Sequence, residues 1–416
     1  MSSDAPTVSF AQVLRNRQFF VLWVAQLISN FGDWLALLAL FSLVAFRWKG
    51  TPYEVSGIFI AFALPWALLG PVAGVFVDRW DLKRTMIASD VVRGLLVLLL
   101  AFATDVYQVY AVVFALGTVS AFFVPAQNAV IPLLVRREEL LVANSINAQT
   151  LQLNKIVGPA AAGFLVAAAG EVACFYLDSV SFVLSAALLS LITARRPPSE
   201  TGRGVAAVLA ELRQGLSFLS QHPAVRFVVL AMVAALVAIG AFDALAAIYV
   251  RDVLAAESRV FGFIISLIGV GSILGSLVIG RFGQRWSRVL LVVLGIGALG
   301  AGVALLALTN TTAVALLISF FLGFGAVGVL VPAQTLIQEE TPQALLGRVS
   351  STSWAMLTVA QLVGVGLAGK VAEWVGIRSL YSAIGVALVL IAALSYGYAR
   401  MRHLLHPLVP PAPAAD

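Results

Sequence analysis

Residues 19–45 read FFVLWVAQLISNFGDWLALLALFSLVA, and Asp33 is the one charged residue in this apolar run. A helix needs about 20 apolar residues to cross the hydrocarbon core of a bilayer. Water is absent from that core, so each backbone N–H and C=O must find its hydrogen-bond partner within the protein. An α-helix meets this requirement within one segment. The run therefore predicts a transmembrane helix.

Similar apolar runs recur along the whole chain. Together with the first they fall near 19–45, 55–77, 86–104, 107–130, 146–169, 173–193, 226–250, 260–280, 288–308, 312–334, 351–371 and 379–399. Of the 416 residues, 61% are hydrophobic and 11% are charged. A soluble domain carries about 25% charged residues. The sequence therefore predicts an all-α membrane protein with twelve transmembrane helices.

The positions of the lysines and arginines predict the orientation of the chain. Eighteen of the 26 lie at the termini or in connections that follow even-numbered spans, and six lie in the other connections. Basic residues are enriched in cytoplasmic loops of membrane proteins. Both termini are therefore expected in the cytoplasm. The first span, rather than a cleaved leader, is expected to direct the chain to the membrane.

Short motifs recur at similar spacing in the two halves of the chain. The stretch FGDWLA at 31–36 resembles AFDALA at 241–246, which places Asp33 and Asp243 210 residues apart. The tetrapeptide VPAQ occurs at 124–127 and again 207 residues later. A repeat of parallel halves predicts two six-helix bundles that bind substrate between them, near the middle of the membrane. Chance recurrence of common membrane tetrapeptides is the alternative.

These halves give the expected domain organisation. Residues 1–193 are expected to form an N-terminal bundle and residues 226–400 a C-terminal bundle. Residues 194–225 form a cytoplasmic linker, and residues 401–416 a cytoplasmic tail. Within the linker, four apolar residues have helical spacing: Val208, Leu212, Leu216 and Leu219. This spacing predicts an amphipathic helix that lies on the membrane surface or against the cytoplasmic helix ends.

Several classes of function are disfavoured by the composition. The single Cys174 and three histidines, which lie in loops or the tail, indicate no metal site and no disulfide framework. The net charge of +6 resides mostly between apolar runs, so we expect no nucleic-acid partner. Residues 364–371 resemble a phosphate-binding loop, but Val371 replaces its final Ser or Thr. We expect no nucleotide, no cofactor and no enzymatic activity.

A loop between the second and third spans carries a family resemblance. The pattern Gly74-x-x-x-Asp78-Arg79-x-Asp81-x-Lys83-Arg84 resembles the loop signature of the major facilitator superfamily. The resemblance implies the major facilitator fold of two six-helix halves. It also implies a gating role for the residues of this loop.

Further motifs resemble particular branches of that superfamily. Gly158-Pro159-x-x-x-Gly163 is similar to the Gly-Pro motif of its antiporters. Stretches 31–34, 124–128 and 177–182 resemble the drug-efflux branch, which includes macrolide exporters and the enterobactin exporter. This implies efflux of a hydrophobic or amphipathic small molecule, driven by proton influx, across a bacterial cytoplasmic (inner) membrane.

The resemblance implies three partners, namely a small-molecule substrate, protons and membrane lipids, and a single chain as the working unit. The sequence departs from the family pattern in two places. Family antiporters often carry an arginine in the fourth span, but residues 107–130 contain no basic residue. The second-half loop also lacks the aspartate of the signature. A lysolipid or lipid flippase and a small-solute importer on the same scaffold are the alternative functions, and a receptor or scaffold without transport is a third.

Charged residues within the spans are the candidate functional residues. A charge at the centre of a membrane helix costs at least about 2.5–3.5 kcal/mol, so each one invites a reason. Asp33, Asn30 and Gln26 have spacings that place them on one face of the first span. We expect this face to line a cavity in which Asp33 exchanges protons or recognises a cation. A structural ion pair, for example with Lys155, is the alternative.

The other intramembrane charges have two interpretations each. Asp243 is either the second-half equivalent of Asp33 or a solvated carboxylate at a cavity mouth. Lys155 is expected either to take part in proton coupling or substrate binding, or to form a structural ion pair with Asp33 or with Asp178. Asp178 is otherwise expected to serve structure or an external gate. Asp90 and Arg93 are expected near the cytoplasmic end of the third span.

There the Asp90 and Arg93 pair is expected to form a gate network with Asp78 and Arg79. An interfacial pair that merely anchors the helix is the alternative. Gln127 and Gln334 are intramembrane amides that either orient substrate or join helices.

Overall fold

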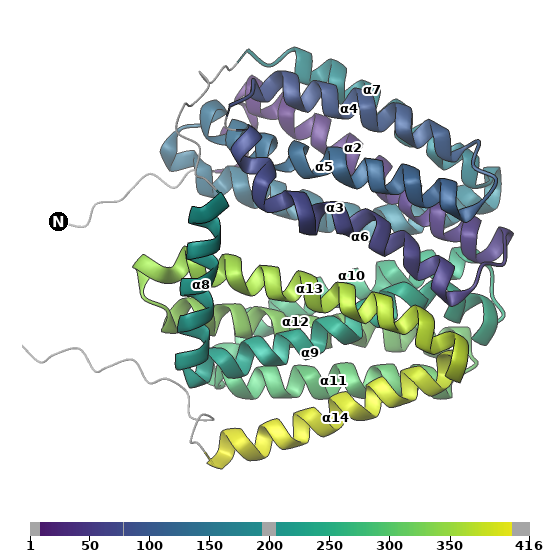
Figure 1. Ribbon diagram of the computed structural model, residues 1–416, viewed down its shortest axis with the longest axis vertical. Helices are drawn as coiled ribbons and strands as arrows, with labels where there is room; N and C mark the ends of the chain where they lie inside the picture. The colour runs from purple at the N-terminus through teal and green to yellow at the C-terminus, as the bar shows by residue number, and fades with distance from the viewer. Residues whose placement is uncertain (1–8, 78, 194–204, 402–416) are drawn as a thin grey trace, which may run out of the picture. The chain divides into compact units, whose positions relative to one another are not determined.

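The computed structural model describes residues 9–77, 79–193 and 205–401, and within these ranges every regular element is a helix (Figure 1). The first half contains α1 (Phe10–Leu14), α2 (Arg17–Ser42), α3 (Pro52–Val77), α4 (Leu82–Leu100), α5 (Val106–Leu134), α6 (Leu140–Ala169) and α7 (Glu171–Ser190). The remainder contains α8 (Val205–Gln221), α9 (Pro223–Ile248), α10 (Ser258–Phe282), α11 (Arg288–Leu308), α12 (Thr312–Glu340), α13 (Gln343–Val375) and α14 (Ile377–Met401).

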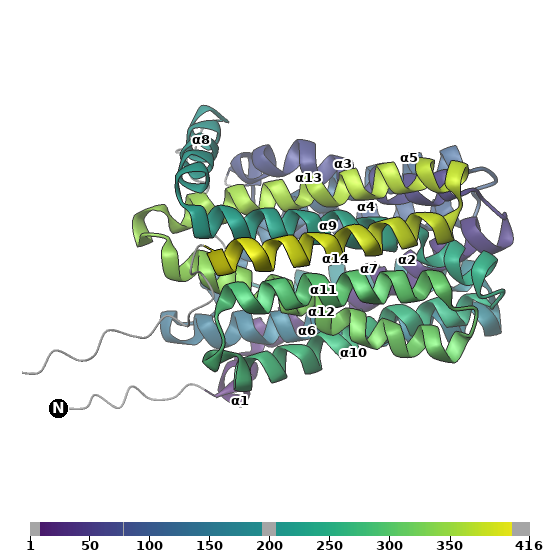
Figure 2. The same cartoon turned by 90° about the horizontal axis from the view of Figure 1, so that it is seen from below.

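The predicted spans correspond to long helices, which Figure 2 shows from a second side. Eleven helices of the described residues are long and apolar enough to cross a membrane. The predicted third span forms α4, which composition alone does not mark as a span because it carries Lys83, Arg84, Asp90 and Arg93. The prediction of an all-α, multi-pass membrane fold is confirmed.

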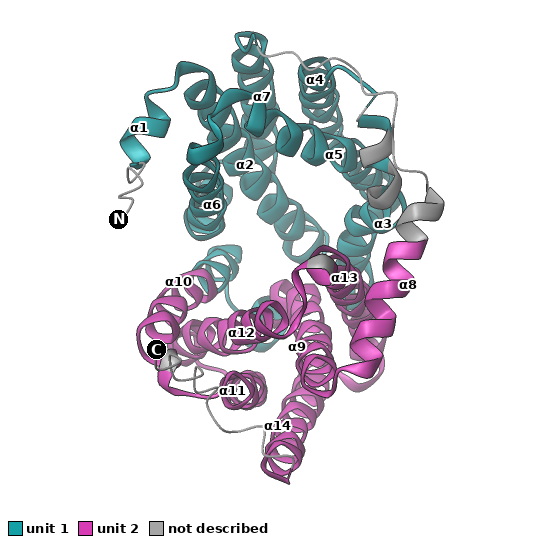
Figure 3. Cartoon of the chain, turned by 90° about the vertical axis from the view of Figure 1, so that its left-hand side faces the viewer, with its two compact units in different colours: residues 1–208, 250–266 teal, residues 209–249, 267–416 magenta. Residues whose placement is uncertain are grey.

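The chain divides into two compact units, drawn in teal and magenta in Figure 3. Unit 1 comprises Met1–Val208 and Val250–Ser266, and unit 2 comprises Leu209–Tyr249 and Leu267–Asp416. In unit 1, α2 packs against α6 and α7, and α5 packs against α3 and α4. In unit 2, α11 packs against α12 and α14, and α9 packs against α13 and α12. Each unit is therefore a helical bundle with its own interior.

The two halves repeat with a register of 206 residues. Five pairs of helices begin 206 residues apart: Arg17 and Pro223, Pro52 and Ser258, Leu82 and Arg288, Val106 and Thr312, and Glu171 and Ile377. Packing contacts follow the same register, because Gly117 lies against the carbonyl of Phe62 and Gly323 against that of Ile268. The register-equivalent of Asp33 is therefore Ile239.

This register corrects the alignment of the two aspartates. Asp243 lies four residues, or about one helical turn, beyond the position equivalent to Asp33. The stretches FGDWLA and AFDALA are thus similar in residue type, but they do not occupy equivalent positions in the two halves.

Helices α2 and α9 end in the same way. A π-helical turn, η1 (Leu43–Arg47) or η3 (Tyr249–Val253), is followed by a residue with positive φ, Lys49 at 53° or Ala255 at 48°. The next amide closes the turn: Gly50 N donates to Val44 O (2.8 Å) and Ala256 N to Val250 O (3.0 Å). Residues other than glycine rarely adopt this left-handed conformation. Each residue of the first turn lies 206 residues before its equivalent in the second turn.

Helix α8 follows the residues 194–204, which lie outside the described part of the chain. Arg348 of α13 donates to Gln214 (2.6 Å), and Gly215 lies against Thr352 of the same helix. Leu219 is buried, whereas Leu216 is exposed. One side of α8 is therefore attached to the first turns of α13.

Candidate functional site

Unit 1 encloses a cavity of about 350 Å³. Helices α2, α3, α4 and α5 form its walls, and α7 contributes Asp178. Its polar lining consists of Gln26, Ser29, Asn30, Asp33, Arg93, Ser120, Gln127 and Asp178. Its aromatic lining consists of Trp34, Phe41, Phe59, Phe62, Trp66 and Phe123. The cavity thus combines apolar walls with a few polar and charged groups, as small-molecule sites do.

The residues of the predicted face of α2 lie together in this cavity. Gln26, Asn30 and Asp33 all line it, and Gln127 joins them from α5. Asn30 donates from Nδ2 to the carbonyl of Gln26 (2.7 Å), which fixes its side chain along the helix. Asp33 is exposed to the cavity rather than enclosed by protein.

Asp90 and Arg93 form a buried ion pair within α4. Ser185 of α7 donates to the second carboxylate oxygen of Asp90 (2.6 Å). The guanidinium carbon of Arg93 lies 4.1 Å from the ring centre of Phe123 and 4.5 Å from that of Phe182. Cation–π contacts of this kind are strengthened by removal from water. Arg93 is therefore held by its ion pair with Asp90 and by contacts with two aromatic rings.

The ion pair lies deeper than the sequence predicted. Asp81 caps the first turn of α4 by accepting a hydrogen bond from the Arg84 amide (2.8 Å), so the helix begins at Leu82 rather than at 86. Arg93 consequently lies in the middle of the helix, where it lines the cavity. The expected gate network of this pair with Asp78 and Arg79 stays a prediction, because Asp78 lies outside the described residues.

Asp178 is a candidate functional residue of this cavity, whereas the sequence predicted for it a pair with Lys155, a structural role or an external gate. It is buried, lines the cavity, and accepts a hydrogen bond from Ser181 Oγ (3.1 Å). It interacts electrostatically with Asp33 and Arg93. Gly32 packs directly against Asp178 and Ser181, so α2 and α7 approach closely beside Asp33. A buried acid in an otherwise apolar span was the sequence signal for this residue.

Lys155 forms neither of the ion pairs that the sequence suggested. It is exposed on α6, and within the described ranges no acid pairs with it. Asp33 and Asp178 instead interact electrostatically with Arg93.

The Gly-Pro motif of α6 is a packing surface within unit 1. Gly158 lies against the side chain of Trp34. The carbonyl of Pro159 lies against Gly262. A Cβ placed on Gly163 would lie 3.1 Å from the Cα of Arg259. Absence of side chains here lets helices approach closely.

The loop signature attaches α4 to its neighbours. Gly74 lies in the last turns of α3, and Arg79 and Arg84 are exposed. Lys83 Nζ donates to the carbonyl of Ser190 at the end of α7 (2.6 Å). With the cap from Asp81, this contact fixes the first turn of α4.

The second-half candidates lie in unit 2. Asp243 is half-buried and accepts a hydrogen bond from Gln361 Nε2 of α13 (3.4 Å). Gln334 lines a small cavity of about 60 Å³ together with Gln338, Ser350 and Ser353. These residues do not come together with one another as Asp33 and its neighbours do.

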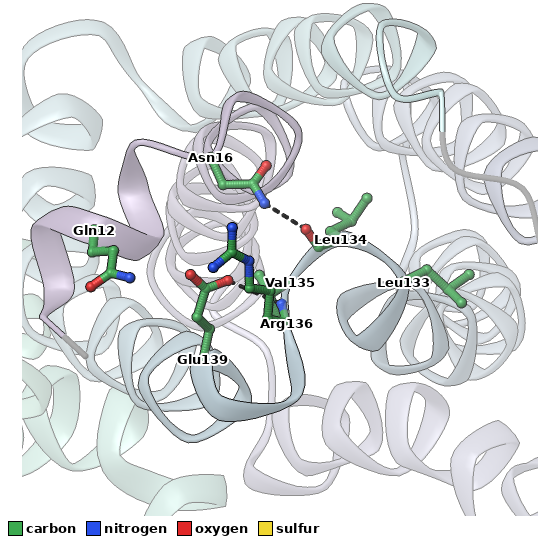
Figure 4. A pocket seen from close by; sticks show the side chains of 7 residues that line it. All are labelled: Gln12, Asn16, Leu133, Leu134, Val135, Arg136 and Glu139. Atoms are coloured by element: carbon green, nitrogen blue, oxygen red, sulfur yellow. Dashed lines mark hydrogen bonds between the residues drawn. The ribbon is translucent and has the colours of Figure 1, made fainter. Parts of the chain in front are cut away.

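A second large hollow in unit 1, about 540 Å³, lies at the helix ends (Figure 4). Asn16 caps α2 and donates from Nδ2 to the carbonyl of Leu134 (2.6 Å). Glu139 accepts a hydrogen bond from the Arg136 amide (3.0 Å). These polar groups form hydrogen bonds with backbone atoms of the α5–α6 connection. Their role is therefore to hold this connection in place.

Comparison with known proteins identifies the family. The family model described as Major Facilitator Superfamily matches residues 22–354 and 256–414. The chain belongs to the major facilitator superfamily. Members of this family are membrane transporters rather than enzymes, so the chain is a multi-pass transporter.

Relatives of this superfamily member include efflux proteins. It is 29% identical to the uncharacterized MFS-type transporter YfiS of Bacillus subtilis, over 92% of this chain and 94% of the relative. It is 24% identical to macrolide efflux protein A of Streptococcus pyogenes, over 90% and 94%. It is 27% identical to the multidrug efflux pump Tap of Mycolicibacterium fortuitum, over 87% and 92%.

A solved structure has the same fold. The crystal structure of the nucleoside transporter NupG superimposes with a TM-score of 0.74 at 13% identity, over 91% of this chain and all of the other. At this identity the likeness concerns the fold alone.

Proposed function

We propose that the protein is a proton-coupled exporter of a hydrophobic or amphipathic small molecule that works by alternating access. The observation that carries this proposal is the cavity of unit 1, in which aromatic walls surround Asp33 and Asp178. The names of two relatives, a macrolide efflux protein and a multidrug efflux pump, support export and an amphipathic substrate.

Charge balance in the cavity favours ion coupling. Three carboxylates, those of Asp33, Asp90 and Asp178, interact electrostatically with Arg93, and Asp90 forms an ion pair with it. Asp178 is buried, and a buried carboxylate without a paired charge is costly unless it binds a proton or a cation. Asp33 and Asp178 therefore offer a place where a proton and a substrate compete.

Transport requires the cavity to open to each side in turn. We propose that the bundles of residues 1–193 and 226–400 move against each other, with residues 194–225 as linker and 401–416 as tail. The contacts of Pro159 with Gly262 and of Gly163 with Arg259 join residues of these two ranges, and small residues there permit close approach of the helices. The proposed setting is the inner membrane with both termini cytoplasmic, surrounded by lipid, and one chain as the working unit.

Proteoliposomes with an imposed pH gradient test the coupling. Uptake of radiolabelled erythromycin into vesicles with an acidic interior should exceed uptake without a gradient. Asp33→Asn should abolish the difference, because an amide does not exchange a proton in this range. Glu138→Gln, at an exposed position outside the cavity, is the matched control and should behave as the unchanged protein. Transport that ignores the gradient, or that Asp33→Asn leaves intact, would contradict the proposal.

A lipid flippase is the second candidate. An apolar groove of about 480 Å³ lined by α2, α6 and α7 favours it, because an acyl chain would fit such a surface. Gly32 and Ser181 line this groove and lie next to Asp178 of the cavity. Translocation of a headgroup-labelled lysolipid, with and without erythromycin as competitor, separates the two functions.

A further inference from the structure

Three unpaired hydrogen-bond donors lie around one cavity. Within the described residues, five buried side-chain nitrogen or oxygen atoms have no hydrogen-bond partner, and three of them are Gln26 Nε2, Trp66 Nε1 and Arg93 Nε. These three side chains come from α2, α3 and α4, and all line the cavity of unit 1. The other two atoms belong to His222 and Thr341, which lie in unit 2 and do not line it.

The donors are held in place by their surroundings. Gln26 is 4% exposed and Arg93 is 6% exposed. The side chain of Arg93 is restrained by its ion pair with Asp90 and by contacts with two phenylalanine rings. Buried donors are normally satisfied by protein or by an ordered molecule, and leaving them unsatisfied is costly. Their partner is therefore to be sought in the cavity.

We propose that this cavity recognises accepting oxygen atoms (ester, ketone or hydroxyl) of an amphipathic substrate, through the N–H groups of Gln26, Trp66 and Arg93. This inference rests on the proposed function and defines the class of its substrate. A hydrophobic cation without an accepting oxygen leaves these buried donors unsatisfied. An analogue that carries such an oxygen pairs with them and should bind more tightly.

Two fluorescent dyes with the same charge provide a matched pair. Tetramethylrhodamine methyl ester and tetramethylrosamine share one cationic ring system, and only the first carries an ester. Binding of each dye to the purified full chain in nanodiscs, with no ion gradient, isolates recognition from coupling. We expect the ester dye to bind about 3- to 10-fold more tightly, as one or two net hydrogen bonds would give.

Two substitutions remove donors while keeping an apolar or isosteric side chain. Gln26→Met and Trp66→Phe should each reduce the preference, and the double variant should bring it within about 2-fold of unity. Trp23→Phe is the control for loss of an indole N–H, because Trp23 donates to Thr150 (2.7 Å) and does not line the cavity. Its preference for the ester dye should be unchanged. Thermal unfolding of every variant verifies folding.

The outcomes decide the inference separately from proton coupling. A preference for the ester dye that falls in both donor variants and persists in Trp23→Phe supports it. Equal affinities for the two dyes, binding of neither, or a preference that survives in the double variant overturns it. Because no gradient is applied, these results do not depend on whether Asp33 carries a proton during transport.

Discussion

The interiors of the two bundles differ, although their helices repeat in register. At the positions equivalent to Asp33, Asp90, Arg93 and Asp178 of unit 1, unit 2 has Ile239, Ile296, Leu299 and Ile384. Ile296 and Leu299 are buried. The packing framework is nonetheless the same, because Gly94 lies against Phe182 and Gly300 against the equivalent Leu388.

This difference separates what folds a bundle from what it does. Unit 2 shows that the same helices pack with aliphatic residues at all four positions, so the charges of unit 1 are not required by the fold. Buried charges are retained at a cost in stability. The contrast therefore concentrates the candidate functional groups in unit 1.

The largest expected effect comes from removing one partner of the buried ion pair. Asp90→Leu leaves the guanidinium of Arg93 buried without its carboxylate and should lower the free energy of unfolding by about 3–5 kcal/mol. The double variant Asp90→Leu/Arg93→Met should recover most of the loss, since unit 2 accommodates aliphatic residues there. Chemical unfolding in mixed micelles measures both. A double variant as unstable as the single one would show that the pair holds the bundle together.

A smaller effect is expected where α2 meets α7. A Cβ on Gly32 would overlap Ser181 and Asp178, so Gly32→Ala should cost about 1–3 kcal/mol of unfolding free energy. The equivalent residue of unit 2 is already Ala238, and Ala238→Gly should cost only about 0.5–1 kcal/mol. The same unfolding assay compares them. Equal costs would mean that the close approach at Gly32 is not specific to unit 1.

The smallest effect is expected at the acid of unit 2. Asp243 is half-buried and its hydrogen bond to Gln361 is long, so Asp243→Asn should change the unfolding free energy by less than about 1 kcal/mol. In the proteoliposome assay it should reduce gradient-driven transport less than Asp33→Asn does. Equal losses in the two variants would remove the functional distinction between the bundles.

The sequence predicted the helices and one face of the site, because both depend on local periodicity. Apolar runs located the spans, and the three- and four-residue spacing joined Gln26, Asn30 and Asp33. The proximity of Asp178 to Asp33 depends on the packing of α2 against α7, which no local pattern specifies. The position of Arg93 in the cavity depends on the cap at Asp81 that starts α4 one turn early.

The sequence also misjudged two relations between distant segments. Lys155 was expected to pair with an acid, yet the acids lie near an arginine from a different helix. Asp243 was aligned with Asp33 by residue type, whereas helix boundaries place it one turn later. Both errors concern register and packing, which require the positions of several helices at once.

The matching turns after α2 and α9 restrict substitution at two exposed corners of the chain. Lys49 and Ala255 both adopt a backbone conformation that favours glycine, and each turn is closed by the same hydrogen bond. Glycine is the one residue without a Cβ that this conformation crowds, so Lys49→Gly and Ala255→Gly relieve local strain in the folded chain.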